Sequence, residues 1–319
     1  MNMSSNNKEF KLSIVLRTQL KRIDCLEDAL LCLVGQSNQS FELLIVLHSE
    51  EGRNELDSLL SKQPKSLMHK VKVLQAVGGN RGVPLNVGIS ASNGTHIAFY
   101  DDDDLLTSTW VEEFHKAGVL HPANILRSQV GTLWSQRVSY KSNMEQVVQM
   151  AEPTAEYRST YSHTDHLLVS NTPFMSLCFP ISLFKNQGLM ADENLAVCED
   201  WDLLLRASNV LEIIDIPVVT SFYRRWIGQE TSYSLHDAQV WQESEAAVLA
   251  KLSEESLVLP GQEIYRIREL LEIEKESHTL RQSAEEKKQM EQSLSWRITA
   301  PLRLIRGTIR RKSSEQKGK

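Results

Sequence analysis

Two short apolar segments with a helical pattern between them constrain the fold of this chain more than any other feature. The segments are FKLSIVL at residues 10–16 and FELLIVL at residues 41–47, both rich in the branched and aromatic residues of buried strands. Between them, one helical face collects Ile23, Leu26, Ala29, Leu30, Leu33 and Val34. A strand, a helix and a strand in this order build a parallel sheet, with ligands expected at the carboxyl ends of its strands.

The sequence also predicts where this first helix begins and ends. Asp24 and Glu27 have the spacing of a capping box, and Gly35 follows the last apolar residue. The pattern therefore predicts a helix that begins near Asp24 and ends at Gly35.

The alternation of strands and helices continues along the chain. We expect a charged helix at 51–62, strands at 71–77 and 95–100, and helices at 84–94 and 107–120. The segment ILRSQVGTLWSQRVSY alternates as an antiparallel strand does, and residues 210–225 read as a pair of strands. The prediction is an α/β fold with a mixed sheet flanked by helices. It comprises a disordered N-terminus at 1–10, a sheet domain at 11–235 and a helical extension at 236–319 with a basic amphipathic tail.

Four consecutive aspartates, Asp101 to Asp104, directly follow the predicted strand at 95–100. Neighbouring carboxylates repel one another by roughly 1 kcal/mol in water and by more when partly dehydrated. A divalent cation removes this conflict, and Mg²⁺ is usually held by one or two carboxylates together with substrate phosphates. The alternative is a solvated loop whose acids favour the start of the next helix. A calcium loop of the EF-hand type is disfavoured, because Leu105 and Leu106 stand where it needs a ligand and a glycine.

A second acidic cluster occurs in CEDWDLLLR, where Glu199, Asp200 and Asp202 fall at the predicted start of a helix. A carboxylate that is partly buried beside other carboxylates has a raised pKa, which suits a general base near neutral pH. The alternative is that the acids only stabilise the helix N-terminus while Trp201 packs into the core.

Composition narrows the function classes. The formal net charge is −6 and the isoelectric point is about 5.9, which argues against a general nucleic-acid binder. Cys25, Cys32, Cys178 and Cys198 show no metal-type pairing, so we expect free thiols in a reducing compartment. No apolar run approaches the roughly 20 residues that span a bilayer. We expect a cytoplasmic protein.

Taken together, these segments resemble glycosyltransferase family 2, the inverting nucleotide-sugar transferases of the GT-A fold. The resemblance rests on an ordered series over residues 11 to about 232, namely SIVLRT, ALLCLVGQ, FELLIVL, PLNVGISASNGTHIAFYDDDD, CEDWDLLLR and SFYRR. It implies a metal-dependent hexosyltransferase that uses a nucleotide-sugar donor and a glycan or glycolipid acceptor, in bacterial surface polysaccharide synthesis.

The resemblance implies a donor site and a metal site. Arg17 and Thr18 match the loop that lies along the nucleotide base, and Asn86 matches the asparagine of a loop that usually reads RN. Asp101 and Asp103 match the DxD pair, in which Asp103 is the expected ligand of Mn²⁺ or Mg²⁺ and Asp101 lies near the ribose and the metal. Asp102, between them, is included in the predicted donor site.

The same resemblance assigns the reacting groups. Asp200 matches the base that activates the acceptor hydroxyl, with Glu199 beside it, and Trp201 is expected to line the acceptor site.

Three positions depart from the family pattern and motivate a rival function. Leu47 and His48 stand where an acid pair commonly grips the base, Leu85 replaces a usual arginine, and Trp226 replaces a common histidine. A catalytically inactive module that binds a nucleotide sugar or a glycan therefore stays open. A nucleotidyltransferase is disfavoured, because RTQLKRID lacks the glycines of a phosphate loop.

The C-terminal segment SWRITAPLRLIRGTIRR resembles the endings of bacterial polysaccharide-building transferases. One helical face would carry Leu302, Ile305 and Ile309, flanked by Arg303, Arg306, Arg310 and Arg311. This pattern favours contact with the inner face of the cell membrane, and a solvated or partner-binding helix is the alternative.

Overall fold

The computed structural model describes residues 9–140, 144–228, 236–293, 296 and 298. The chain divides into two compact units, Met1–Leu259 and Pro260–Lys319. The first unit thus extends past residue 235, where the sequence predicts a domain boundary. The predicted disordered stretch at 1–10 lies outside the described residues except for Glu9 and Phe10, and Phe10 is buried. The predicted basic amphipathic tail, with Leu302, Ile305, Ile309 and its arginines, lies outside the described residues.

The first unit alternates strands and helices along the chain. In order, its elements are β1 (Leu12–Thr18), α1 (Ile23–Val34), β2 (Phe41–His48), α2 (Arg53–Leu60), α3 (Lys65–Met68), β3 (Val71–Ala76), α4 (Gly82–Ala91), β4 (His96–Asp101), β5 (Leu105–Leu106) and α5 (Trp110–Leu120). These are followed by β6 (Ile125–Tyr140), β7 (Met144–Gln149), α6 (His163–Leu168), η1 (Phe174–Ser176), β8 (Leu177–Pro180), α7 (Ser182–Lys185), α8 (Glu199–Ser208), β9 (Ile213–Trp226) and α10 (Ala238–Ser253).

The strands of the described residues form one nine-stranded mixed sheet in the order β3-β2-β1-β4-β8-β6-β9-β5, with β7 paired to β6. The strands β1 to β4 are parallel, as the sequence predicts, and β8 enters antiparallel to β4. The prediction for 125–140 is confirmed in part, because β6 is antiparallel to β7 and β8 but parallel to β9.

The prediction of two strands at 210–225 is wrong. The segment Ile213–Trp226 is one long strand, β9. Its pairing with β6 shifts register between Ser128, opposite Ile216, and Gln129, opposite Val219. The skipped residues include Pro217, which has no N–H to give to a ladder and is accommodated at this irregularity without ending the strand.

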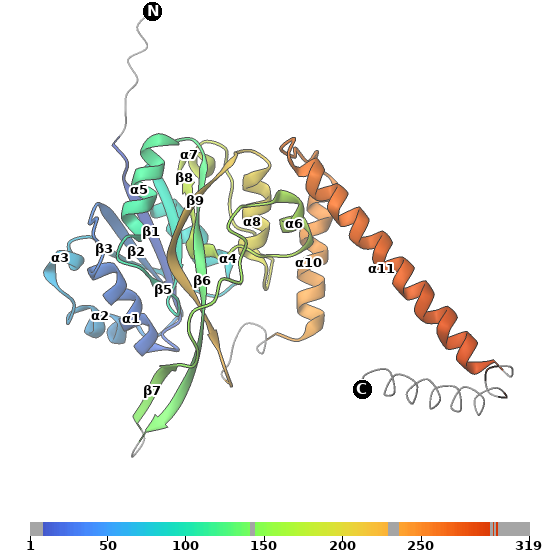
Figure 1. Cartoon of the computed structure of the whole chain (residues 1–319). Helices are drawn as coiled ribbons and strands as arrows, with labels where there is room; N and C mark the ends of the chain where they lie inside the picture. Colours follow the sequence, from blue (N-terminus) through green and yellow to red (C-terminus); the bar gives the residue numbers. More distant parts are fainter. Residues whose placement is uncertain (1–8, 141–143, 229–235, 294–295, 297, 299–319) are drawn as a thin grey trace, which may run out of the picture. The chain divides into compact units, whose positions relative to one another are not determined.

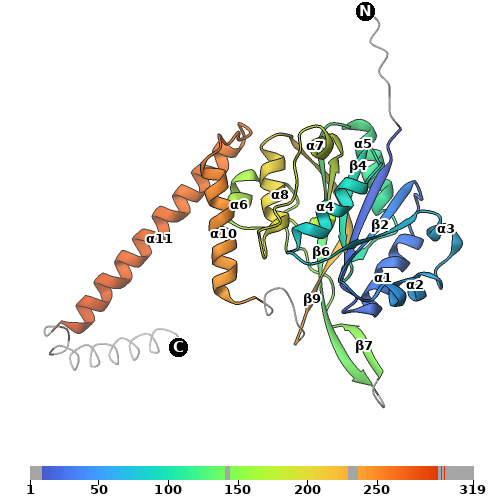
Figure 2. The same cartoon turned by 180° about the vertical axis from the view of Figure 1, so that it is seen from behind.

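Helices cover both faces of the sheet, and the alternation of side chains along each strand supplies both cores. Leu12, Ile14 and Leu16 of β1 pack with α1, α2 and α5, whereas Val15 packs with α4, α7 and α8. Figures 1 and 2 show these two layers from opposite sides. A third cluster joins α8 to α10 through Trp201, Leu205, Val248 and Leu252, with Leu195, Val197 and Cys198. Helix α10 is thereby packed into the first unit.

Helix α1 ends at Gly35 as predicted, but the predicted capping box is wrong. The helix begins at Ile23, Arg22 occupies the cap position, and no side chain caps it. Asp24 instead accepts a hydrogen bond from Arg137 Nη2 at 2.6 Å. The carboxylate of Asp24 therefore pairs with Arg137, which is distant in the sequence, and does not cap the helix.

The second unit contains α11 (Glu263–Gln292), a single charged helix (Figure 1). Among the residues that the structure describes, none of the helices combines the length and the apolar character needed to span a membrane.

Candidate active site

The carboxyl ends of β1 and β4 open into a cleft of about 1090 Å³. The two strands pair in parallel with Arg17 opposite Asp101, so both side chains reach the same edge of the sheet. The loop before α4 and the ends of β6 and β9 complete the walls. Of the residues predicted from the sequence, those that line the cleft are Arg17, Thr18, Asp101, Asp102 and Asp103.

Arg17 connects the two acidic clusters. Its Nε and Nη2 atoms donate to the carboxylate of Asp101, with Nη2 at 3.0 Å from Oδ2. Its Nη1 atom donates to Glu199 Oε1 at 2.7 Å. The end of β4 and the start of α8, far apart in the sequence, therefore meet around one guanidinium.

Each aspartate after β4 has a different partner. Asp102 accepts from Thr18 Oγ1, and Asp103 accepts from Arg22 Nη1 at 2.5 Å and from the indole of Trp226 at 3.3 Å. Asp104 is only 4% exposed and accepts from the backbone N–H of Arg224 at 2.9 Å. Asp104 thus anchors β9 from the interior, whereas the side chains of Asp101 and Asp103 are each 27% exposed.

The aspartates differ in how fully their charge is offset. Burial opposes ionisation of Asp101, but the adjacent Arg17 outweighs it and holds the pKa of Asp101 below its usual range. Burial and the charge of Asp103 raise the pKa of Asp102 to about 7. Burial and the charge of Asp101 also raise the pKa of Asp103. Of these three carboxyl groups, that of Asp101 therefore ionises most readily.

Glu199 and Asp200 open α8 but differ in environment. Glu199 is 1% exposed, and beside its Arg17 contact its Oε1 lies 3.0 Å from Nε of Arg81. Burial raises its pKa, but Arg81 and Arg17 outweigh that effect and the pKa of Glu199 is lowered. Burial and the charge of Glu199 raise the pKa of Asp200 to about 6. Asp200 is half-buried, while Glu199 contacts two guanidinium groups.

Sequence reasoning missed Arg81, which lies in the loop GGNRG one helical turn before Leu85. Leu85 stands where the family usually has an arginine, and it is buried in the core. Arg81 instead lines the cleft, where its charge helps to lower the pKa values of Asp101 and Glu199 against the effect of burial. The sequence feature that could have identified Arg81 is a charged residue in a glycine-rich loop that follows a strand.

The sequence names Trp226, at the end of β9, only as a departure from the family pattern, and the structure places it beside the acidic cluster. The ring of Trp226 lies 5.0 Å from the guanidinium of Arg22 and 5.4 Å from that of Arg224. Its indole N–H reaches Asp103. Trp226 therefore contributes a hydrogen bond and a packing surface at the position where the family often has a histidine.

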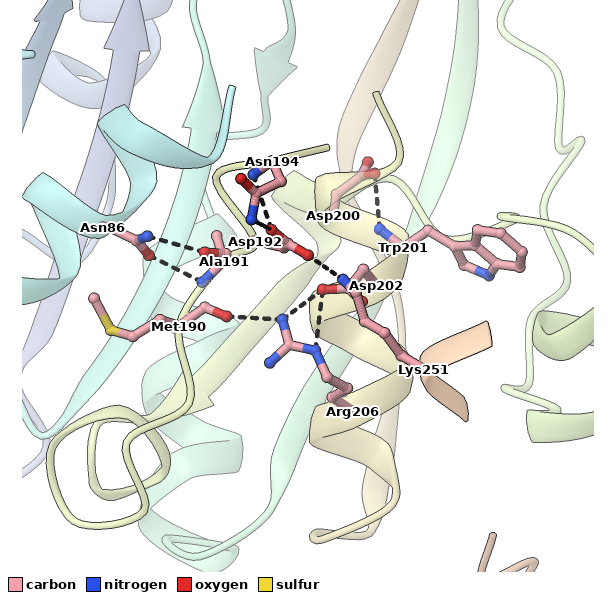
Figure 3. Close-up of polar contacts among 10 residues, drawn as sticks. All are labelled: Asn86, Met190, Ala191, Asp192, Asn194, Asp200, Trp201, Asp202, Arg206 and Lys251. Carbon is pink, nitrogen blue, oxygen red and sulfur yellow. Dashed lines mark hydrogen bonds and ion pairs between the residues drawn. The ribbon is translucent and has the colours of Figure 1, made fainter. Parts of the chain in front are cut away.

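Four predicted site residues do not line the cleft, namely Glu199, Asp200, Asn86 and Trp201. Trp201 is 4% exposed, packs in the cluster between α8 and α10, and donates its indole N–H to His166 O at 2.7 Å. This matches the alternative in which Trp201 packs into the core. Asn86 is buried and exchanges two hydrogen bonds of 2.9 Å with the backbone of Ala191 (Figure 3). Asn86 therefore holds a loop.

Within the described residues, no group of three or more His, Cys, Asp or Glu side chains is arranged to hold a metal ion. Mg²⁺ needs fewer protein ligands when substrate phosphates complete its shell. Asp101 and Asp103 are hard oxygen donors on the cleft wall, and burial together with the charge of Asp101 raises the pKa of Asp103. The donor set fits a divalent cation whose coordination is completed by a diphosphate.

Comparisons with known proteins give a fold but no family. No protein-family model matches the chain, and no curated protein sequence matches it. Among solved structures, it is similar to S. aureus TarS 1–349 in complex with UDP-GlcNAc, with a TM-score of 0.57, 16% identity, and coverage of 78% of this chain and 68% of that one. The complex of the same fragment with UDP gives a TM-score of 0.53 and 15% identity, with coverage of 78% of this chain and 67% of that one.

For a further structure, of S. aureus TarS, the match covers 78% of this chain and 40% of that one, with a TM-score of 0.53 and 15% identity. At this level of identity the likeness concerns the fold. The chain therefore has the mixed α/β fold of structures that bind UDP-GlcNAc and UDP in the TarS complexes.

Proposed function

We propose that this chain is a metal-dependent inverting glycosyltransferase that moves a sugar from a nucleotide-diphosphate sugar to a hydroxyl of a glycan or glycolipid acceptor. A role in bacterial surface polysaccharide synthesis is part of the proposal and comes from the resemblance of the sequence. The fold shared with sugar-nucleotide-bound TarS supports the donor class.

One observation carries the proposal. The guanidinium of Arg17 contacts both Asp101 and Glu199, so the aspartates after β4 and the acids of α8 share a single site. A site for glycosyl transfer needs cationic groups for the leaving diphosphate and a base for the acceptor. Arg17 and Arg81, which both contact Glu199, would supply the positive charge, and the adjacent Asp200, with its raised pKa, would supply the base.

The chemistry proposed for the protein's own residues is an in-line displacement. Asp200 accepts the proton of an acceptor hydroxyl as its oxygen forms a bond to the anomeric carbon. The bond from that carbon to the diphosphate breaks on the opposite face, which inverts the configuration. Arg17 and Arg81 present positive charge to the departing nucleoside diphosphate, and Glu199 keeps both guanidinium groups in place.

Asp103 and Asp101 are the residues that would hold a Mg²⁺ or Mn²⁺ ion, which supplies positive charge beside the leaving diphosphate. Arg17 and Thr18 remain the candidates for contacts with the nucleoside, and Asp102, bonded to Thr18, lies next to them.

The test is release of nucleoside diphosphate from a panel of nucleotide sugars with Mn²⁺ or Mg²⁺, beginning with UDP-GlcNAc. The variant Asp200→Asn should lose turnover by at least about 100-fold because it cannot accept a proton. Its donor affinity, measured by calorimetry, should stay near that of the wild type, since Asp200 is not among the proposed donor contacts. Full activity of this variant would exclude Asp200 as the base.

A second function from another class is a non-catalytic module that binds a nucleotide sugar or glycan. It is favoured by Leu47 and Leu85, which are buried in the core and offer no polar group to a ligand. This function predicts donor binding without any release of nucleoside diphosphate, so the same panel separates it from the transferase.

Contact of the C-terminal tail with an anionic membrane surface stays a prediction from the sequence. Co-sedimentation of the full chain and of a chain ending at residue 292 with vesicles rich in anionic lipid tests it. Equal binding of the two would exclude the tail as the membrane contact.

A further inference from the structure

The loop of residues 189–198 leads directly into Glu199 and Asp200, and we call it the entry loop. It ends at Cys198, which caps α8 in the left-handed region with φ of 67°. A residue with a β-carbon is strained in this region, and such strain persists where the surrounding structure fixes the backbone. The position of Asp200 therefore depends on the contacts that hold the entry loop in place.

Two neighbouring helices hold the first half of this loop. Asn86 of α4 pairs with both backbone polar groups of Ala191, and its Nδ2 also donates to Glu193 Oε1 at 2.8 Å. From α8, Arg206 donates to the carbonyl of Met190 at 2.7 Å (Figure 3). These contacts fix the loop against the sheet and against α8.

The third contact comes from α10. Lys251 forms an ion pair with Asp192 of the entry loop, and its Nζ donates to Asp202 Oδ1 of α8 at 2.9 Å (Figure 3). The other oxygen of Asp202 accepts two hydrogen bonds from Arg206, at 3.0 and 2.5 Å. Lys251 thus bridges the entry loop and the helix that carries Asp200.

Burial and further hydrogen bonds hold the groups that Lys251 connects. Asp202 is 1% exposed, so its contacts are little screened by water. Asp192 also accepts from the backbone N–H of Asn194 at 2.8 Å, which folds the loop around the same carboxylate. On α10, Val248 and Leu252 flank Lys251 and are buried against α8. The ammonium group of Lys251 is therefore carried by a helix that packs against α8.

We propose that Lys251 is a positioning residue, which locks the entry loop to α8 and so keeps Asp200 where it meets the acceptor hydroxyl. This inference rests on the proposed function. It assigns a role in the reaction to a helix that the sequence places outside the sheet domain. Lys251 itself does not line the cleft, so it acts through the loop and not on the substrate.

The experiment compares Lys251→Met, Lys251→Arg and the control Lys62→Met in the full chain. Lys62 is an exposed lysine that follows α2. Lys251→Met should fold, because Arg206 still pairs with the buried Asp202. Its kcat for release of UDP from UDP-GlcNAc, or from the nucleotide sugar identified by the panel, should fall by about tenfold or more, since small displacements of a reacting group are costly.

The pattern of effects separates positioning from general destabilisation. The KM for the donor should stay within about twofold of the wild type, because only an interaction used in the transition state is weakened. Lys251→Arg keeps the charge and should recover kcat to within about threefold. Hydrogen exchange in peptides covering 189–198 should be faster in Lys251→Met than in Lys62→Met.

Two results would overturn the inference. One is unchanged exchange of the entry loop in Lys251→Met, and the other is faster exchange with an unchanged kcat. The exchange measurement needs no activity. A wild type that turns over no donor would therefore refute the proposed function, while the lock of the loop is still tested by exchange alone.

Discussion

Glu199 and Asp200 are adjacent carboxylates whose pKa values shift in opposite directions, and the difference arises from what each one faces. Glu199 points to two guanidinium groups and stays ionised, whereas Asp200 faces that ionised neighbour and is partly dehydrated. Environments that push two carboxyl pKa values apart are a recurrent feature of acid and base assignments. The sequence grouped both residues as catalytic, and in the structure only Glu199 is paired with two arginines, while the pKa of Asp200 is raised.

The pH dependence of turnover follows from Asp200. Its pKa of about 6 lies above the usual value, so the base is ionised above pH 6 and is lost by protonation as the pH falls. We expect kcat/KM at pH 5 to be about tenfold below its value at pH 7. In Glu199→Gln the repelling charge is removed while the arginines remain, so the acid limb should move to lower pH. If the acid limb of the pH profile does not move in Glu199→Gln, the charge of Glu199 does not raise the pKa of Asp200.

The metal site gives a second prediction for single residues. Asp103→Ala removes one of the two proposed cation ligands and should abolish the part of the donor affinity that depends on Mn²⁺. Calorimetry with and without Mn²⁺ measures this difference. Asp57→Ala, which changes a surface aspartate paired with Arg53 on α2, should retain the Mn²⁺ effect. Equal metal dependence in Asp103→Ala and the wild type would remove Asp103 from the site.

Among the secondary-structure elements, α4 packs closely on β1 through Gly88. A β-carbon on Gly88 would lie 2.3 Å from Cγ1 of Val15, a fully buried residue of the central strand. The close approach brings the start of α4, with Arg81, to the cleft edge beside Arg17. The absence of a side chain at Gly88 is therefore a requirement of the site as well as of the core.

Gly88→Ala should lower the free energy of unfolding by about 1 to 3 kcal/mol, because Val15 is stiff and cannot move aside easily. The gain in helix propensity, about 1 kcal/mol, is too small to offset strong overpacking. Urea unfolding measures the change. Gly35→Ala is the matched control, since its β-carbon would meet nothing closer than 3.5 Å. A variant Gly88→Ala as stable as the wild type would show that α4 can shift.

At the scale of the whole molecule, the question is where the functional unit ends. The sequence places a boundary at residue 235, but α10 buries Val248 and Leu252 against α8, and the first compact unit runs to Leu259. Full burial of each of these side chains is worth about 1.5 to 3 kcal/mol. Helix α10 should therefore behave as part of the sheet domain.

A chain ending at Leu259 should keep cooperative unfolding and donor turnover, and a chain ending at residue 235 should lose both. The second truncation exposes the cluster around Trp201 and removes Lys251. Thermal unfolding and nucleoside diphosphate release measure the two properties. Turnover by the shorter chain would show that α10 is dispensable.

The sequence by itself determined the local and periodic features of this protein. The apolar strands, the face of α1 and the acids at the end of β4 follow from side-chain periodicity and from the rule that parallel strands open at one edge. These features sufficed to predict a mixed sheet flanked by helices, with ligands expected at the carboxyl ends of its strands.

Only the tertiary structure decided which partner each charged side chain takes. Asp24 bonds to Arg137 and not to a helix end, Asn86 holds the entry loop, and Trp201 is turned into the core. Arg81 and Lys251 join the site from a loop and a late helix. Such contacts form between residues far apart in the chain, and their strength depends on burial and distance, which a one-dimensional pattern does not contain.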